Sequence, residues 1–511
     1  MDIWEFIPRI SIVRHNDCVS PERIQIFLYI HSDWRGLFVC AAALFTWKGI
    51  YMEENKMISE KTGRLMAKYG LPCITSLLVG ALYNIVDQIF IANASYLGSY
   101  GNAANSVVFP LTVIALAIAT MIGDGCCAFV SIRLGAKKDT EAKRGVGTSI
   151  LWILFASAVL TVLYLTLAEP ILTAFGARVN DETFALSKEY FFWIALGVPF
   201  YMFGQGLNPV IRSDGSPRYA MVSLLAGALT NCILDPIFIY PLRMGMKGAA
   251  IATVLGQIVS AAITLLYLTR MKTTPLERGA FTFCHGGIGK IASLGMTSFL
   301  SQVSIVLSMA AVLNMCQKYG ALDPIFGLEE YAQIPTAVIG IVMKFFQIVM
   351  SIAIGLSAGC IPVVGYNIGA GRKDRASRLM LELLTTECII GLCATVLFTC
   401  FPDAFISIFG AKNESVYYTE FALRCIRLFL STTALACVNK GTFIYLQSLG
   451  KAWTSAGLSL LREVGFGVGL VLLLPIWFGL DGVLWFMPAA DILTFFVCIP
   501  VIAHVYKELR E

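Results

Sequence analysis

The sequence is short of charge. Only 14% of its 511 residues are Asp, Glu, Lys or Arg, whereas 57% are hydrophobic, and the mean hydropathy is +0.74. Soluble domains carry about 25% charged residues, so this composition excludes a soluble globular protein. Continuous apolar stretches of about 20 residues, the length of a transmembrane helix, recur about twelve times. The sequence therefore predicts an all-α membrane protein with about twelve transmembrane helices.

Residues that build metal centres and active sites are also scarce. The 4 histidines lie near the ends or in a connecting loop, with no second His or Cys at ligand spacing. Most of the 15 cysteines stand singly in apolar runs, which is typical of small core residues rather than of a disulfide framework. The spans show no cluster of a nucleophile with a base. We therefore predict no enzyme, no cofactor, no resident metal and no nucleic-acid partner.

What the chain does contain is a long internal repeat. Phe175-Gly176-Ala177 recurs as Phe409-Gly410-Ala411, 234 residues later. The same offset relates Gly125-Cys126 to Gly359-Cys360, Gly135-Ala136 to Gly369-Ala370, and Gly248 to Gly482. A period of this size indicates two duplicated domains, because solenoid repeats are far shorter. Six spans per half is an even number, so we expect two parallel six-helix repeats.

The repeat divides the chain into parts. The linker contains Pro and several Gly residues, which mark a boundary, and the first 51 residues have no counterpart in the second repeat. We expect them to be an extension outside the core. The predicted parts are an N-terminal extension at 1–64, an N-lobe at 65–270, a cytoplasmic linker at 271–290, a C-lobe at 291–506 and a C-terminal tail at 507–511.

Basic residues gather after the even-numbered spans. The connections after odd-numbered spans are mostly neutral or acidic, and the basic clusters lie at 133–144, 212–218, 270–278 and 372–378. Loops rich in Lys and Arg stay in the cytoplasm. We therefore predict that both termini are cytoplasmic and that the protein lies in the plasma or inner membrane.

Two carboxylates stand inside predicted spans of the first repeat, Asp87 and Asp235. A charged side chain at the bilayer centre costs about 2.5 to 3.5 kcal/mol on insertion scales, so it indicates a functional site. Asn84 shares a helix face with Asp87, and Asn231 lies one turn before Asp235. Thr253 in the sixth span falls at a comparable depth. We expect these groups to converge if the three helices adjoin.

The chemistry of this group suits a cation. Pro236 has no N–H for the carbonyl of Cys232, which adds a free oxygen. Carboxylate, amide, hydroxyl and carbonyl oxygens favour a hard ion such as Na⁺. The pair can also carry a proton, because two carboxylates close together in a low-dielectric site cannot both stay ionised. The alternative, a purely structural hydrogen bond across the bundle, would be made at lower cost by Asn or Ser.

The second repeat lacks these acids and carries Lys344, Glu463 and Asp491 within its spans. Opposite charges at one depth most simply form an internal ion-pair network, which is the interpretation we favour. The alternative is that Lys344, with Asn84 of the first span, lines a substrate path. Asp124, between two glycines near the end of the second span, is interpreted as a residue at a water-accessible helix end.

Several motifs together resemble the multidrug and toxic compound extrusion (MATE) transporters, from about residue 65 to the C-terminus. They are Tyr83-Asn84 with Asp87, Gly365-Tyr366-Asn367 before Gly369-Ala370, Arg212-Ser213-Asp214-Gly215 with Pro217-Arg218, and Gly248-Ala249-Ala250-Ile251-Ala252-Thr253. The resemblance implies two six-helix lobes around a central cavity. It also implies a cation-linked site in the N-lobe, matched by Asp87, Asn231, Asp235 and Thr253. A branch of the family with its key acid in span 7 is not matched.

We therefore expect a monomeric antiporter that exports amphipathic, often cationic drugs or toxic compounds in exchange for Na⁺ or H⁺. Alternating access would arise from the two lobes rocking against each other. The only metal expected is Na⁺ at the four cation-coupling residues. The alternative is a flippase of lipid-linked saccharides, which also uses two helical bundles. A wide and strongly basic cavity would favour the flippase, but the spans carry few Arg or Lys residues.

Overall fold

The computed structural model describes residues 54–94, 96–175, 177–178, 181–271, 273–276, 278–281, 285–328, 331–408 and 416–511. These residues form helices and the turns between them, with no strand in the described ranges. Residues 1–53 of the predicted extension lie outside the described part of the chain.

The prediction of an all-α membrane protein is confirmed. In the described residues 11 helices are long and apolar enough to span a membrane, and a bent pair, α14 with α15, makes a further span if counted as one. The spans of the first half are α3 (Thr62–Asn93), α4 (Gly98–Gly135), α5 (Asp139–Thr166), α7 (Asp181–Ser213), α8 (Pro217–Ile239) and α9 (Gly245–Leu268). Those of the second half are α10 (His285–Gly320), α11 (Ile334–Gly369), α12 (Lys373–Cys400), α14 (Val416–Phe429) with α15 (Thr433–Ser448), α16 (Ala452–Leu460) continuing through a π-helix (Leu461–Val468) into α17 (Gly469–Phe478), and α18 (Leu480–Arg510).

Shorter helices lie before the first span and between later ones. They are α2 (Glu54–Ser59), α6 (Ala168–Ala174), α13 (Pro402–Ile408) and a 3₁₀ turn (Arg278–Ala280). The first residues of α3 come from the predicted extension, and the last residues of the predicted linker, 285–290, belong to α10.

The structure repeats with the offset seen in the sequence. Helix α5 covers residues 139–166 and helix α12 covers residues 373–400, so their first and last residues both differ by 234. Helices α6 and α13 are related by the same offset. The turns match as well, because left-handed backbone recurs at equivalent positions. Lys137 has φ 57° where the second repeat has Gly371 at φ 72°. A glycine adopts this conformation without steric cost. The two parallel six-helix repeats are thereby confirmed.

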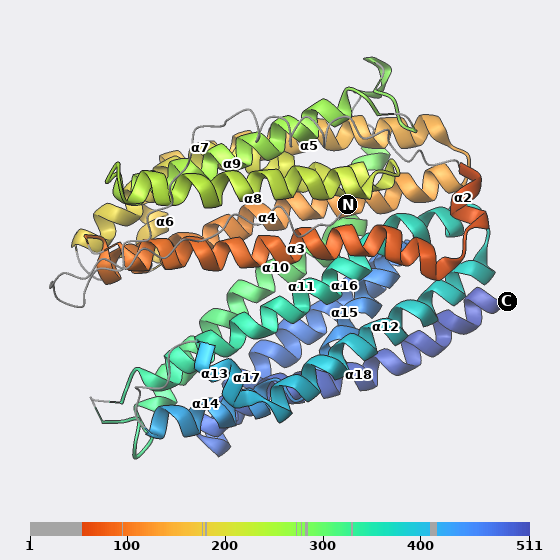
Figure 1. The fold of residues 1–511 in the computed structure, drawn as a ribbon. Coiled ribbons are helices and arrows are strands. Elements are labelled where there is room, and N and C mark those ends of the chain that lie inside the picture. Colours follow the sequence, from red (N-terminus) through yellow and green to blue (C-terminus); the bar gives the residue numbers. More distant parts are fainter. Residues whose placement is uncertain are drawn as a thin grey trace, which may run out of the picture. The chain divides into compact units, whose positions relative to one another are not determined.

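Each repeat packs as a lobe, called here the N-lobe (α3 to α9) and the C-lobe (α10 to α18), and Figure 1 shows the helices of each lobe side by side. In the N-lobe, α7 contacts α4, α5 and α9, and α8 contacts α3 and α9. In the C-lobe, α15 contacts α11, α12, α16 and α18. The lobes meet mainly through α4 with α10 and through α11 with α3 and α4.

Glycines bring the two lobes into backbone contact near one end of the helices. We call this end of the helices the basic end, because it carries the Lys- and Arg-containing turns at 136–138 and 370–372. A Cβ on Gly295 of α10 would lie 1.7 Å from the carbonyl oxygen of Met121 of α4. A Cβ on Gly369 would lie 2.0 Å from the carbonyl oxygen of Ile132. Only glycine fits such approaches, and we call this close packing of α4 against α10 and α11 the interlobe seal.

Candidate functional site

The four residues predicted to couple to a cation meet inside the N-lobe. Asp87 of α3 and Asp235 of α8 are buried, with 8% and 0% of their surface exposed. Their carboxyl groups lie close enough to share a hydrogen bond through one proton. Asn231 Nδ2 donates to Thr253 Oγ1 of α9 over 3.1 Å, and Asn231 also borders Asp235. We call these four residues the acid cluster.

A close helix crossing explains why α8 and α9 bring their side chains together. A Cβ on Gly256 of α9 would lie 2.6 Å from the carbonyl oxygen of Gly227 of α8, so the two backbones touch there. Asn231 lies one turn after Gly227, and Thr253 lies about one turn before Gly256. The crossing therefore places the amide beside the hydroxyl.

Gly256→Ala should separate α8 from α9 and weaken the acid cluster. Even one methyl group collides with a carbonyl oxygen at 2.6 Å, and overpacking of this kind costs about 1 to 3 kcal/mol. Thermal unfolding of the purified protein in detergent measures the loss. Gly80→Ala in α3 is the matched control, because a Cβ there has no neighbour within 4 Å. Equal unfolding midpoints for the two variants would contradict the importance of the crossing.

Two tyrosines fix α3 against α8. Tyr240 donates its hydroxyl to the carbonyl oxygen of Phe90 over 3.1 Å, and Tyr96 donates to the carbonyl oxygen of Ile239 over 2.6 Å. Both bonds lie at the ends of α3 and α8 that are remote from the basic end. They hold the turn that carries Asp87 beside the turn that carries Asp235.

The acid cluster carries negative charge without an internal counterion. With both groups ionised, Oδ1 of Asp87 and both carboxylate oxygens of Asp235 accept no hydrogen bond from the described residues. Oδ1 of Asn231 is equally without a donor in that part of the chain. Buried charge is costly unless it is compensated. These free oxygens therefore fit a bound cation or a proton.

The two residues predicted for a substrate path lie outside the acid cluster. Asn84 is exposed, and its Nδ2 donates to the carbonyl oxygen of Gly80 in its own helix over 2.9 Å. Lys344 of α11 is half-buried, and its Nζ donates to Oε1 of Gln88 of α3 over 3.1 Å. The structure thus brings Lys344 to the N-lobe without joining it to the carboxylates.

Comparison with known proteins identifies the family. The family model described as MatE matches residues 72–237 and 310–473, once in each lobe and over more than half of the chain. The chain belongs to the MatE family. The resemblance seen in the sequence is thereby confirmed. Both matches follow the duplication, and the first includes Asp87, Asn231 and Asp235.

Known MatE relatives cover nearly the whole chain. The multidrug export protein MepA of Staphylococcus aureus (strain NCTC 8325 / PS 47) is 24% identical over 432 residues, which are 84% of this chain and 90% of MepA. The solved MATE multidrug transporter DinF-BH is 31% identical, with a TM-score of 0.78, covering 87% of this chain and 96% of that one. A MATE structure in the straight conformation is 21% identical with a TM-score of 0.80, covering 90% and 99%.

In this MatE protein the buried charges of the C-lobe form an ion-pair network, but with different partners from those predicted. Glu463 Oε1 lies 3.0 Å from Lys440 Nζ, and Glu463 Oε2 lies 2.8 Å from Arg462 Nη1. Asp491 Oδ1 lies 2.9 Å from Arg462 Nη2. The predicted participation of Lys344 is wrong, because that side chain reaches across to α3. Lys440 was missed, although a lysine within the apolar run of span 10 could have been noticed.

Glu463→Gln should destabilise the C-lobe strongly. Lys440 and Arg462 would lose a shared carboxylate while staying buried, and breaking a buried ion pair on one side costs about 3 to 5 kcal/mol. A lower thermal unfolding midpoint of the purified variant checks this. The double variant with Lys440→Met removes one orphaned charge and should recover part of the loss. A single variant as stable as the wild type would contradict the expectation.

Besides the ion-pair network of the C-lobe, a row of linked polar side chains joins the two lobes near the interlobe seal. Arg212 Nη2 of α7 lies 3.3 Å from Asp124 Oδ1 of α4. Ser298 of α10 donates to Asp124 Oδ2 over 2.9 Å, and Gln447 Nε2 of α15 donates to Ser298 Oγ over 3.3 Å. The interpretation of Asp124 as a residue at a water-accessible helix end is therefore wrong, because its carboxylate is paired inside the protein. The linked side chains run from α7 to α15 across the lobe boundary, and the sequence of a single span could not show these partners.

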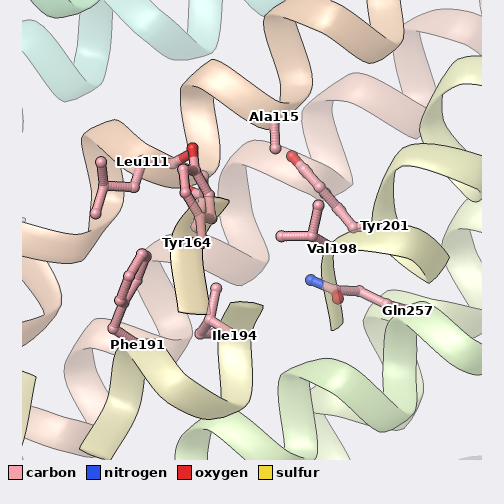
Figure 2. Close-up of a pocket in the computed structure, with 9 residues that line it drawn as sticks. Leu111, Ala115, Tyr164, Phe191, Ile194, Val198, Tyr201 and Gln257 are labelled. Carbon is pink, nitrogen blue, oxygen red and sulfur yellow. The ribbon is translucent and has the colours of Figure 1, made fainter. Parts of the chain in front are cut away.

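A small pocket lies within the N-lobe between α4, α5, α7 and α9. Figure 2 shows Tyr164, Phe191, Tyr201 and Gln257 around it, together with aliphatic side chains. Tyr164 donates to the carbonyl oxygen of Leu111 over 2.8 Å, and its ring packs at a tilt against the ring of Phe191. The lining carries no charged side chain. The lining includes no residue of the acid cluster and none of the C-lobe.

Proposed function

We propose that this MatE protein is an antiporter that exports amphipathic, often cationic drugs or toxic compounds in exchange for Na⁺ or H⁺. The observation that carries the proposal is the pair of buried carboxyls, Asp87 and Asp235, without an internal counterion among the described residues. The names of its relatives MepA and DinF-BH support multidrug export. By the positive-inside rule the basic end faces the cytoplasm of the plasma or inner membrane.

The coupling ion acts through charge compensation. Ionised Asp87 and Asp235 repel each other, and binding of a cation or a proton removes this repulsion. Helix α3 can then close on α8, and because α3 also contacts α11, its shift is transmitted to the C-lobe. The ion changes the transporter's conformation only if it binds one state more tightly than the other.

Alternating access requires a barrier that opens and closes. The interlobe seal and the chain from Arg212 to Gln447 provide a barrier at the basic end. We propose that separation of α4 from α10 and α11 opens the binding space to the cytoplasm, while the seal as observed closes it.

The flippase alternative is not favoured. A lipid-linked saccharide carries phosphate and calls for a strongly basic cavity. The buried cations Arg212, Lys440 and Arg462 are instead neutralised by Asp124, Glu463 and Asp491.

Ethidium accumulation in cells tests the proposed export. Cells that express the chain should accumulate several-fold less dye than cells with an empty vector, and replacing external Na⁺ should weaken the effect if Na⁺ is the coupling ion. A well-expressed protein in the membrane that leaves accumulation unchanged would contradict drug export.

A further inference from the structure

Lys344 differs from the other cations inside the spans. Arg212, Lys440 and Arg462 each face a carboxylate within 3.3 Å. In the described part of the chain, Lys344 forms no ion pair, and its hydrogen bond goes to the neutral amide oxygen of Gln88 over 3.1 Å. An ammonium within a membrane span marks a substrate or ion path unless it is paired.

The position of Lys344 places it at the boundary of the lobes. It lies on α11, and Gln88 lies on α3, so their hydrogen bond joins the C-lobe to the N-lobe. The contact is about four turns along α11 from Gly359, which packs against the backbone of Gly70 of α3. Lys344 therefore lies beyond the tightly packed part of the interface.

Exposed amides surround this contact. Asn84 lies one turn before Gln88 on α3, and Gln347 lies about one turn after Lys344 on α11, and both are exposed. Polar groups in a span are costly against hydrocarbon. We therefore place this polar face at the space between the lobes, where a substrate passes.

The chemistry of Lys344 selects an anionic group. A charge-assisted bond to a carboxylate is about twice as strong as a bond to a neutral acceptor. Asp87 and Asp235 cannot supply that carboxylate, because they are buried among N-lobe helices and form no ion pair with Lys344. A carboxylate on a bound molecule can displace the Gln88 amide and take its place.

We propose that Lys344 is a specificity-determining residue that binds a carboxylate of the transported molecule. It makes zwitterionic amphipaths better substrates than the corresponding esters, which are purely cationic. This inference rests on the proposed export function and adds a substrate class to it.

A matched pair of dyes tests the inference. Rhodamine 6G is a cationic ester, and its free acid differs by one carboxylate. Their transport is measured with the full chain in proteoliposomes of neutral phosphatidylcholine. The wild type should have the lower KM for the free acid. Lys344→Gln should raise the KM for the free acid about tenfold, the factor that corresponds to ~1.4 kcal/mol, and leave the KM for rhodamine 6G unchanged.

Two further variants separate recognition from folding. Lys344→Arg keeps the charge and should retain the preference for the free acid. Lys318→Gln removes a lysine at the C-terminal end of α10 and should behave like the wild type. If Lys344→Gln changes transport of both dyes equally, or changes neither, the inference is overturned.

Changing the lipid composition distinguishes a carboxylate of the transported molecule from a lipid headgroup as the anion that Lys344 binds. The same assay is repeated with phosphatidylglycerol added. If the anionic lipid stimulates rhodamine 6G transport through the wild type but not through Lys344→Gln, Lys344 binds a lipid headgroup and the inference is overturned. A wild type that transports neither dye contradicts the proposed export function itself, whereas equal effects on both dyes contradict only the role of Lys344.

Discussion

Asp235→Asn is expected to reduce ion-coupled drug export by about 100-fold. An ion that moves a two-state equilibrium from 1:99 to 99:1 must favour one state about 10⁴-fold, and most of that preference needs a charged ligand set. Asn keeps the shape of Asp235 and removes its charge, so Asp87 no longer has a second carboxylate with which to share a proton or Na⁺. Ethidium accumulation in cells measures the effect, with expression quantified in the membrane.

Glu387→Gln is the matched control for this variant. Glu387 is a fully buried carboxyl of the C-lobe whose Oε1 accepts a hydrogen bond from Ser357 over 2.7 Å. Its neutralisation removes an intramembrane acid at a distance from the acid cluster, and export should persist. Normal export by Asp235→Asn, or equal loss in both variants, would contradict a specific role of the N-lobe carboxyls.

Gly295→Ala is expected to cause the largest structural effect at the lobe boundary. Its new methyl group would lie 1.7 Å from the carbonyl oxygen of Met121, which belongs to the backbone and cannot rotate away. Helices α4 and α10 must separate, at a cost of about 1 to 3 kcal/mol or more. We expect a lower unfolding midpoint and a seal that no longer closes, so that drug export is lost.

Gly289→Ala in the same helix isolates this effect, because a Cβ at Gly289 has no neighbour within 4 Å. Accessibility of a single cysteine at the seal to a membrane-impermeant maleimide reports on closure. Labelling from the basic side should rise in Gly295→Ala and stay low in Gly289→Ala. Low labelling in both variants, with normal export, would show that the lobes tolerate a wider crossing.

The sequence could predict features that depend on local pattern. The offset of 234 residues predicted two equivalent lobes, and α5 and α12 have matching bounds. Asp87, Asn231, Asp235 and Thr253 could be placed at one depth by counting residues along spans, and the structure brings them together. Their role in coupling stays a prediction.

Contacts between distant helices could not be predicted in this way. The partner of Lys344 depends on how α11 crosses α3. Its position along the span predicted an ion pair with Glu463 and Asp491 of its own lobe instead. Asp124 looked accessible because it lies near a helix end, but α10 of the other lobe covers it and supplies Ser298. Such crossings are set by small residues such as Gly125 and Gly295, whose partners a single sequence does not reveal.

Ion-driven transport by the purified protein tests cation coupling most directly. The full chain in proteoliposomes is given a fluorescent cationic dye and then an imposed Na⁺ gradient or pH gradient, with no other energy source. We predict that one of the two gradients drives the dye against its concentration gradient in the wild type, and that Asp87→Asn and Asp235→Asn permit only downhill movement. Uphill transport that persists in both variants, or that neither gradient can drive in the wild type, would contradict a coupling site at these carboxyls.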